Sequence, residues 1–429
     1  MTITRPLDPT EVYYEVVDRM WPMNALGVIE LTGDHSPAEV TEAWAAVTAA
    51  VPIVGARVVR TSPREAHFDF SSPVVGEVEV HDDLLSMLAT VSDTHVSLDG
   101  PLVRCAMAPG SSGGTGFALT AHHSALDGRP MVQLLFLLAR ALEGDDVTGH
   151  PLGAPTQGLG SFTLPERDWT GRRMEMLAVA REIRDEEGFV GNGETPAWYD
   201  RSLDGDRDLA YRLFDLTPEE GLALIRWSKS QGATVHGALT VAVLKTMGAL
   251  TPGAGRLPLS TTVDLRVRAA AAAVDVVGQS AAVVSASFDV TEDPGLLARH
   301  VSEDIRRRVD RCEPELFFAL SGVDKLPVGE ATDKVVRRWM ESATPAPNLS
   351  NLGVVTGDAP ASVRRVCVGL APTPNQVFFI ATTTFRGKVT FILSFDRNRV
   401  SIDPDVFTDT LRGELAALIE EAPPAVDQQ

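Results

Sequence analysis

The sequence is poor in cysteine and lacks any long run of apolar residues. Its 429 residues include three cysteines, Cys105, Cys312 and Cys367, which lie far apart. An odd, widely spaced set fits reduced core thiols better than a disulfide framework or a zinc site. No stretch of 18 apolar residues occurs, and the start, MTITRPLDPTE, has no apolar segment beside basic residues. We therefore expect neither export nor a membrane span, and a cytoplasmic location.

Positive charge is also scarce. Asp and Glu total 58 against 38 Lys and Arg, which gives a formal net charge of -20. A field of that sign repels phosphate backbones and anionic lipid surfaces, so we expect no nucleic-acid partner. We expect no metal site either, because six of the nine histidines show no spacing typical of metal ligands, and His236, at an expected helix start, fits a structural role: the six are His35, His67, His81, His95, His150 and His300.

The composition is that of an ordinary globular protein, with 44% hydrophobic and 22% charged residues. The length suggests two or three domains. An apolar run followed by a helix cap occurs in both halves, with Ser36-Pro37 in the first and Thr217-Pro218 in the second. Gly- and Pro-rich stretches at 150–166 and 191–208 separate these halves. We predict two lobes, residues 1–188 and residues 189–429.

Hydrophobic periodicity predicts helices and strands without strict alternation. Helices are expected at 8–21, 36–51, 217–227, 235–250, around 306–308 and from 403. Strands are expected at 26–31, 103–108, 117–123, 259–268 and 283–290, with a hairpin at 376–385 and 389–395. This order indicates an α/β fold with mixed or antiparallel sheets.

The segment FALTAHHSALDGRP, residues 117–130, carries the clearest chemical signal. Side chains alternate along a strand, so His122 and His123 point to opposite faces. Asp127 and Gly128 then end the strand segment and open a helix. His123 therefore lies at a strand-to-loop edge, where a rigid sheet can present it to a cleft.

A histidine in this position suits general-base catalysis, because an imidazole with a pKa near 6.5 accepts a proton at neutral pH. Asp127 would then pair with an arginine or orient the ring. The alternative interpretation is that both histidines are hydrogen-bonded core residues and that Asp127 is a helix cap. The local pattern alone leaves both interpretations open.

The string HHSALDG, residues 122–128, resembles the HHxxxDG signature of a superfamily of acyl-transferring proteins. Its members include nonribosomal-peptide condensation domains, mycobacterial polyketide-associated acyltransferases, wax ester synthases and plant BAHD acyltransferases. Three further segments resemble this superfamily in the same order, STTVDLRVR at 260–268, VGQSAAVV at 277–284 and NLSNLGVV at 348–355. The similarity runs from about residue 5 to about residue 420, and it is strongest to the stand-alone mycobacterial type.

The resemblance implies two chloramphenicol-acetyltransferase-like lobes with an active-site tunnel at their interface. It implies that His123 is catalytic, that Asp127 and Gly128 shape its loop, and that His122 supports the motif. Arg266 is the implied partner of Asp127, with Arg268 as the runner-up. As oxyanion or substrate contacts we suggest backbone N–H groups near Gly128 or the side chains of Ser350 and Asn351.

The implied activity is acyl transfer from a thioester to a hydroxyl, giving an ester of a lipid or polyketide-like acceptor. The donor would be an acyl-CoA or a phosphopantetheinyl acyl carrier, with no permanently bound cofactor. Two alternatives remain: a free-standing condensation enzyme that forms an amide, and an inactive scaffold of the same fold. The plant-type DFGWG segment is missing, since SFDRNR stands at 394–399. We expect a monomer.

Two other features allow competing interpretations. GSSGG, residues 110–114, matches a nucleophile elbow around Ser112, but strands on both sides of it favour a hairpin loop. A basic group stands out in this acidic chain. It is either a solvated helix face or a dock for an acyl carrier protein or the phosphates of coenzyme A, and its members are Arg306, Arg307, Arg308, Arg337 and Arg338.

Overall fold

A computed structural model describes residues 4–149, 193–268, 277–315, 326–357 and 359–425, with isolated positions between 174 and 185. The predicted lobe boundary at 188/189 and the Gly/Pro-rich stretch at 150–166 lie outside the described residues. The division into residues 1–188 and 189–429 therefore stays a prediction.

A five-stranded sheet forms the centre of the first lobe, in the order β12-β2-β7-β6-β5. Its strands are β2 (Asn24–Leu31), β5 (Val78–Val80), β6 (Val103–Pro109), β7 (Thr115–His122) and β12 (Val363–Leu370). Helices α2 (Pro37–Ala50) and α4 (Gly128–Leu142) pack on one side, with α4 against β2, and α3 (Leu84–Asp93) packs on β6 and β7. Because β12 pairs with β2, this sheet combines strands from both predicted lobes.

A six-stranded sheet forms the centre of the second lobe, in the order β10-β9-β11-β13-β14-β8. Its strands are β8 (Leu209–Leu216), β9 (Arg256–Asp264), β10 (Ala281–Asp289), β11 (Asn348–Val354), β13 (Phe379–Phe385) and β14 (Lys388–Asp396). Strand β11 runs parallel to β9 and β13, whereas the other pairs are antiparallel. The helices beside this sheet are α7 (Pro218–Ser230), α8 (Val235–Ala249), α9 (Pro294–Asp310) and α12 (Pro404–Glu420).

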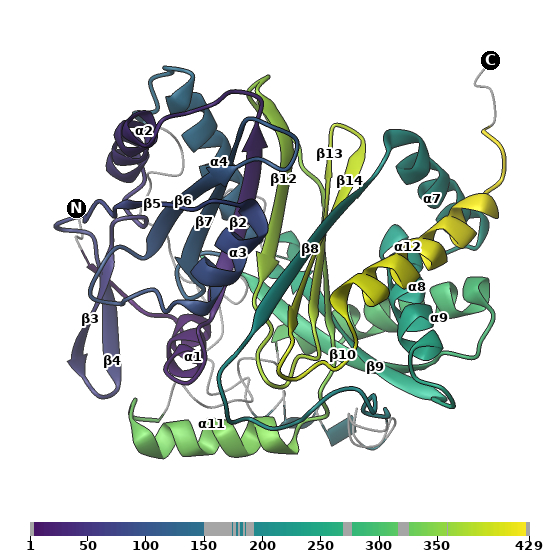
Figure 1. Cartoon of the computed structure of the whole chain (residues 1–429). Coiled ribbons are helices and arrows are strands. Elements are labelled where there is room, and N and C mark those ends of the chain that lie inside the picture. Colours follow the sequence, from purple (N-terminus) through teal and green to yellow (C-terminus); the bar gives the residue numbers. More distant parts are fainter. Residues whose placement is uncertain are drawn as a thin grey trace.

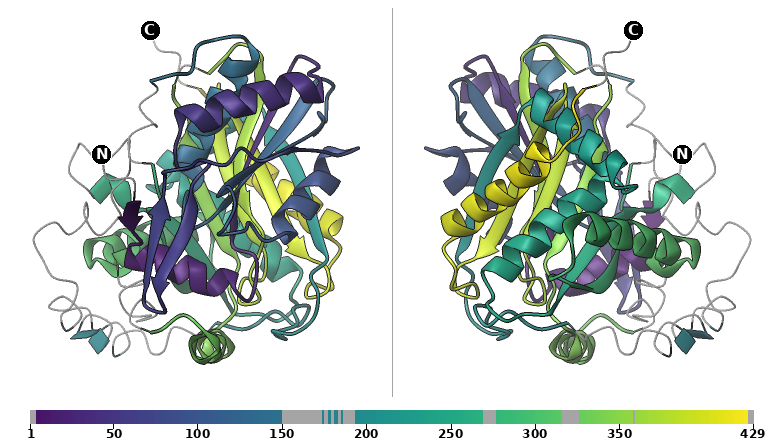
Figure 2. Two further views of the ribbon diagram at one scale, coloured as in Figure 1. Left: turned by 90° about the vertical axis from the view of Figure 1, so that its left-hand side faces the viewer. Right: turned by 90° about the vertical axis from the view of Figure 1, so that its right-hand side faces the viewer.

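The two sheets meet where β12 packs against β13 and β14, near the middle of Figure 1. A small sheet made of β1 (Thr4–Pro6), β3 (Arg57–Ser62) and β4 (Glu65–Asp69) lies at the edge of the first lobe. Helix α1 (Pro9–Asp18) contacts helix α11 (Glu330–Ser342), which runs below both sheets in this view. The side views in Figure 2 show the helices of the second lobe stacked against one face of its sheet.

The capping signals in the sequence mark real helix starts. Asp8, Ser36 and Thr217 each accept a hydrogen bond from the N3 or N2 backbone N–H, and each donates its own backbone N–H to a glutamate carboxylate, so all three form capping boxes. One strand prediction is wrong at its end. The strand expected to reach Arg268 stops at Asp264, where the aspartate side chain accepts the Arg266 N–H at 3.0 Å and starts a 3-10 turn (Leu265–Arg268).

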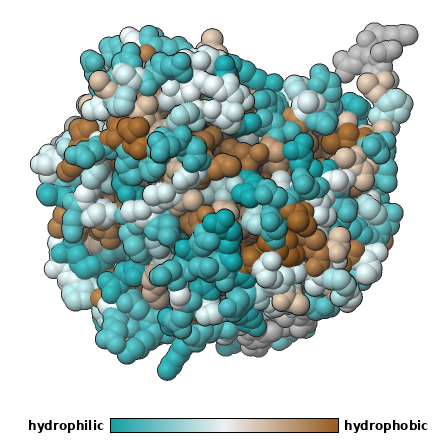
Figure 3. Space-filling view, viewed as in Figure 1, coloured by the Kyte–Doolittle hydropathy of each residue, from teal (hydrophilic) through white to brown (hydrophobic). Residues whose placement is uncertain are grey.

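The mixed α/β fold with mixed sheets is thus confirmed. GSSGG lies between the antiparallel strands β6 and β7, as the hairpin interpretation expects. Within the described ranges, no helix has the length and apolar character needed to cross a bilayer. Hydrophilic side chains cover most of the face drawn in Figure 3, with apolar patches gathered near its middle.

Candidate active site

A cavity of about 510 Å³ opens between the two lobes. Helix α1, strand β2 and the loop after β7 contribute from the first lobe, and β9, β10, β11 and α11 contribute from the second. Its wall includes His123, Asp127, Gly128, Arg266, Ser350 and Asn351. The structure therefore brings together six residues that the sequence analysis selected from three distant segments. The cavity lies within the usual size range of small-molecule sites.

His123 follows the last residue of β7 and has a half-buried side chain. Its backbone N–H donates to the Met23 carbonyl at 2.9 Å, which fixes the loop to the start of β2. Its Nδ1 lies 3.1 Å from the Leu126 carbonyl, and a carbonyl can only accept, so Nδ1 carries the proton. Nε2 is then the unprotonated nitrogen. Burial lowers the pKa of His123 against the opposing effect of Asp127, so the ring is neutral at neutral pH.

His122 points to the other face of β7, as the alternation predicts, and is fully buried. Its Nδ1 accepts the Ser124 N–H at 3.2 Å, which leaves its proton on Nε2, 3.5 Å from an Asp18 carboxylate oxygen. Asp18 also contacts His95 Nδ1 at 3.1 Å. Burial would raise the pKa of Asp18, but the contacts with His122 and His95 outweigh it and lower that pKa. The contact between His122 and Asp18 thus links α1 to the loop after β7, residues 123–127, which we call the histidine loop.

Asp127 links the two lobes through its carboxylate. As N-cap of α4 it accepts the Arg129 N–H at 3.3 Å. Its other oxygen accepts Arg266 Nη1 at 2.8 Å and the Ser280 N–H at 2.7 Å. Arg266 also donates to the Gly278 carbonyl at 2.7 Å. Both partners of this ion pair have side chains only 4% exposed, so Asp127 is a helix cap and an arginine partner at once.

Gly128 and Asn351 of β11 also line the cavity. A Cβ on Gly128 would lie 3.2 Å from Val368 Cγ2, so a side chain here would crowd the cavity wall. Asn351 Oδ1 accepts Thr382 Oγ1 at 3.1 Å and the Gly353 N–H at 3.0 Å. With Oδ1 so engaged, the Nδ2 group of Asn351 is the end of the amide left to act as a donor.

The predicted basic group does not form one surface. Arg308 is buried, with a side chain 4% exposed that pairs with Asp304 and Glu313. Arg307 pairs with Asp304 as well. Arg337 and Arg338 lie on α11, the helix whose Trp339 lines the cavity, and Arg337 pairs with Asp204.

The sequence analysis missed the tyrosines of α1. Tyr13 and Tyr14 both line the cavity, although the chain has only four tyrosines. Their adjacency in a correctly predicted helix was the available signal. Which face of that helix points inward depends on tertiary packing, and here both rings are buried.

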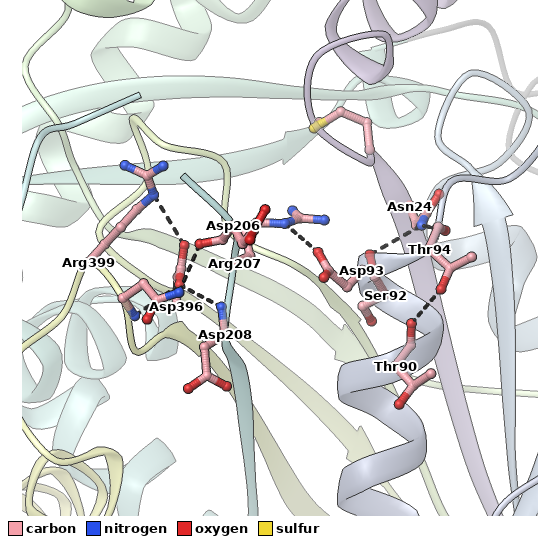
Figure 4. Close-up of polar contacts among 12 residues, drawn as sticks. Asn24, Thr90, Ser92, Asp93, Thr94, Asp206, Arg207, Asp208, Asp396 and Arg399 are labelled. Carbon is pink, nitrogen blue, oxygen red and sulfur yellow. Dashed lines mark hydrogen bonds and ion pairs between the residues drawn. The ribbon is translucent and has the colours of Figure 1, made fainter. Parts of the chain in front are cut away.

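Polar contacts also join the lobes near α3 (Figure 4). Arg207 Nε donates to Asp93 at 2.7 Å across the lobes. Asn24 Nδ2 donates to the carbonyls of Ser92 and Thr94 at 3.2 and 2.8 Å. The hydroxyl of Tyr211 donates to Ser92 Oγ at 2.8 Å. The end of α3 is therefore held both to β2 and to the segment that leads into β8.

Comparisons with known proteins identify the fold. No family model matches the sequence, and no curated protein matches it. The structure is similar to the cyclization-docking bidomain of the nonribosomal peptide synthetase EpoB from Sorangium cellulosum, with a TM-score of 0.70, 16% identity and coverage of 100% of this chain and 87% of that one. It is also similar to the first condensation domain of the CDA synthetase, with a TM-score of 0.67, 16% identity and coverage of 100% and 99%.

Polyketide synthase associated protein 5 from Mycobacterium tuberculosis is similar with a TM-score of 0.63, 14% identity and coverage of 98% and 99%. The chain therefore has the two-lobed fold of condensation domains, which confirms the predicted fold class. The mycobacterial polyketide synthase associated protein 5 shares this fold, in agreement with the resemblance noted in the sequence.

Proposed function

We propose that the protein is an acyltransferase that moves an acyl group from a thioester to a hydroxyl acceptor, with His123 as general base. The observation that carries this proposal is the His123 ring on the wall of a cavity between two lobes, with Nδ1 held by a carbonyl and Nε2 left to accept a proton. The fold shared with condensation domains supports acyl-transfer chemistry at this position.

In the proposed reaction the acceptor hydroxyl gives its proton to His123 Nε2 as its oxygen bonds to the thioester carbonyl carbon. The tetrahedral oxyanion is stabilised by hydrogen-bond donors, for which the backbone N–H groups near Gly128, the Ser350 hydroxyl and the Asn351 amide are our candidates. Collapse breaks the carbon–sulfur bond, and the thiolate takes the proton from Nε2. The products are an ester and a free thiol, and no acyl-enzyme forms.

The donor is proposed to be acyl-CoA or a phosphopantetheinyl acyl carrier, with no permanently bound cofactor. Arg337 and Arg338 are our candidates for contact with an anionic donor, because α11 carries them beside the cavity. Arg306 is exposed on α9. The buried ion pairs of Arg308 favour a structural role for that residue.

The test is thiol release and product mass after incubation with acyl-CoA or acyl-carrier thioesters and either alcohols or amines. His123→Gln is expected to lower turnover by about 10²- to 10⁴-fold, the contribution typical of a general base. The matched control is His300→Gln, an exposed histidine on α9 outside the cavity. Turnover by His123→Gln at the wild-type rate would refute the proposal.

Amide formation is the second candidate, because the similar structures include the first condensation domain of the CDA synthetase and a bidomain of the nonribosomal peptide synthetase EpoB. A product formed from amines but not from alcohols would select it. Failure of the wild-type protein to consume any thioester would instead favour a scaffold.

A further inference from the structure

The ring of Tyr14 lies against the imidazole of His123. Their centroids are 4.3 Å apart and the planes are tilted by 30°. Tyr14 belongs to α1, which is held against the histidine loop through Asp18 and His122. Its ring is buried, so it covers one face of the imidazole and keeps water away from that face. The hydrogen bond to Leu126 then fixes the edge of the same imidazole.

Gln279 of the second lobe holds the tyrosine hydroxyl. Its Nε2 donates to Tyr14 Oη at 3.1 Å and to the Ala281 carbonyl at 2.6 Å. The next residue, Ser280, donates its N–H to Asp127. Two consecutive residues directly before β10, Gln279 and Ser280, therefore contact Tyr14 and Asp127, the two side chains that flank the candidate base.

We propose that Tyr14 is a positioning residue that fixes the orientation and tautomer of His123. Gln279, from the opposite lobe, holds Tyr14 in place through its hydrogen bond to the tyrosine hydroxyl. The inference deepens the general-base function proposed above and rests on it. With its face covered by Tyr14, the imidazole cannot turn about its Cβ–Cγ bond without displacing the phenol. Nε2 therefore stays the nitrogen that faces the reacting groups, which is the arrangement general-base transfer needs.

The charged groups that face His123 from the described part of the chain are paired. From its own loop it faces Asp127, which is bound to Arg266 of the second lobe, and its neighbour is His122. At the cavity wall Arg129 pairs with Asp264 at 2.5 Å. Tyr14 contributes no charge, since burial raises the pKa of its phenol well above 10. Removing its ring therefore changes the access of water to the imidazole and leaves these charges in place.

The experiment compares Tyr14→Leu, Tyr14→Phe and Gln279→Met with the wild-type protein. Tyr14→Leu removes the ring, Tyr14→Phe keeps it without the hydroxyl, and Gln279→Met removes its hydrogen-bonding amide. The matched control is Tyr211→Phe, which deletes a buried tyrosine hydroxyl at the other lobe contact, away from the cavity. Nitrogen-15 NMR of labelled histidine reports the tautomer and titration midpoint of His123, assigned by the signal lost in His123→Gln. Thioester turnover against pH gives kcat and KM.

For Tyr14→Leu we expect mixed tautomers, a higher titration midpoint, and a kcat lowered about 10- to 100-fold with KM changed less than about threefold. Tyr14→Phe should keep the wild-type tautomer, because the ring still covers the imidazole. Since Tyr14→Phe and Gln279→Met remove the same hydrogen bond, both should shift the midpoint in the same direction as Tyr14→Leu by less. Tyr211→Phe should leave the His123 signals unchanged. A Tyr14→Leu protein with the wild-type tautomer and midpoint would overturn the inference.

Two further outcomes are also decisive. If Tyr14→Leu does not fold, an unchanged His123 midpoint in Gln279→Met overturns the inference, and a raised midpoint supports it. If the wild-type protein turns over no thioester, the proposed function fails, while the NMR titration of the free protein still decides whether Tyr14 positions the ring. The two failures are therefore distinguishable.

Discussion

Replacing Asp127 with alanine tests the ion pair that joins the lobes beside the cavity. The substitution removes the acceptor of three hydrogen bonds, from Arg129, Ser280 and Arg266. Arg266, whose side chain is 4% exposed, keeps its contacts with Asp264 at 3.3 Å and with the Gly278 carbonyl at 2.7 Å. The guanidinium keeps its charge because an arginine does not lose its proton in proteins. Removing one partner of this buried ion pair is the main energetic consequence.

The expected loss of stability is large. Breaking a buried ion pair by removing one partner costs about 3–5 kcal/mol, and losing a helix N-cap costs about 0.5–2 kcal/mol more. Proteins are commonly stable by about 5–15 kcal/mol, so Asp127→Ala removes a substantial fraction of the total and lowers soluble yield as well as turnover. Adding Arg266→Met should recover part of the stability, because the buried cation that has lost Asp127 is then gone.

The assay is thermal and urea unfolding of the single and double variants, with thioester turnover measured on the folded protein. Asp405→Ala is the control, since it removes an aspartate of the same kind from the exposed ion pair with Arg212 and should cost less than about 1 kcal/mol. If Asp127→Ala melts like the wild type and loses only turnover, the structural role assigned to this pair is wrong.

Two further predictions concern stability. Burial lowers the pKa of His236 to about 4, whereas the same histidine in the unfolded chain titrates near 6.5. The free energy of unfolding should therefore fall by about 2 kcal/mol between pH 7.5 and pH 5, because the unfolded chain takes up the proton first. Urea unfolding midpoints should show that this fall is smaller in His236→Gln. A Cβ on Gly27 would lie 2.2 Å from Met131 Cγ, so Gly27→Ala should cost about 1–3 kcal/mol by overpacking. Gly413→Ala in α12 meets nothing within 4 Å and should be neutral or stabilising; equal melting temperatures for the two glycine variants would contradict the packing argument.

Features of the fold that depend on neighbouring residues could be predicted from the sequence. A capping box is closed within four residues, so Asp8, Ser36 and Thr217 identified three helix starts correctly. Pairing between distant segments could not be predicted in this way. Strand β12 inserts beside β2, more than 300 residues earlier in the chain, and no local pattern records that partner. Helices α3 and α11 were not predicted either.

The candidate site likewise has features that the local sequence could predict and features that depend on tertiary packing. The period-two alternation correctly separated a buried His122 from a His123 on the cavity wall, because strand geometry alone decides it. The resemblance, not the residue pattern, selected Arg266 for Asp127, and the structure brings the two together at 2.8 Å. The contact of Tyr14 with His123 depends on how α1 packs against the loop after β7, which is a tertiary property.

The geometry around His123 therefore depends on how the two lobes pack against each other. Ser280 and Gln279 reach Asp127 and Tyr14 from the second lobe, so neither flanking residue is held by its own lobe alone. Near the end of α3, contacts such as that of Arg207 with Asp93 join the same two lobes (Figure 4). Because the lobes are tied at both places, movement of one lobe relative to the other would displace the residues that flank the imidazole. The motif HHSALDG carries the candidate base, and residues of the opposite lobe hold Tyr14 and Asp127, the two side chains that flank it.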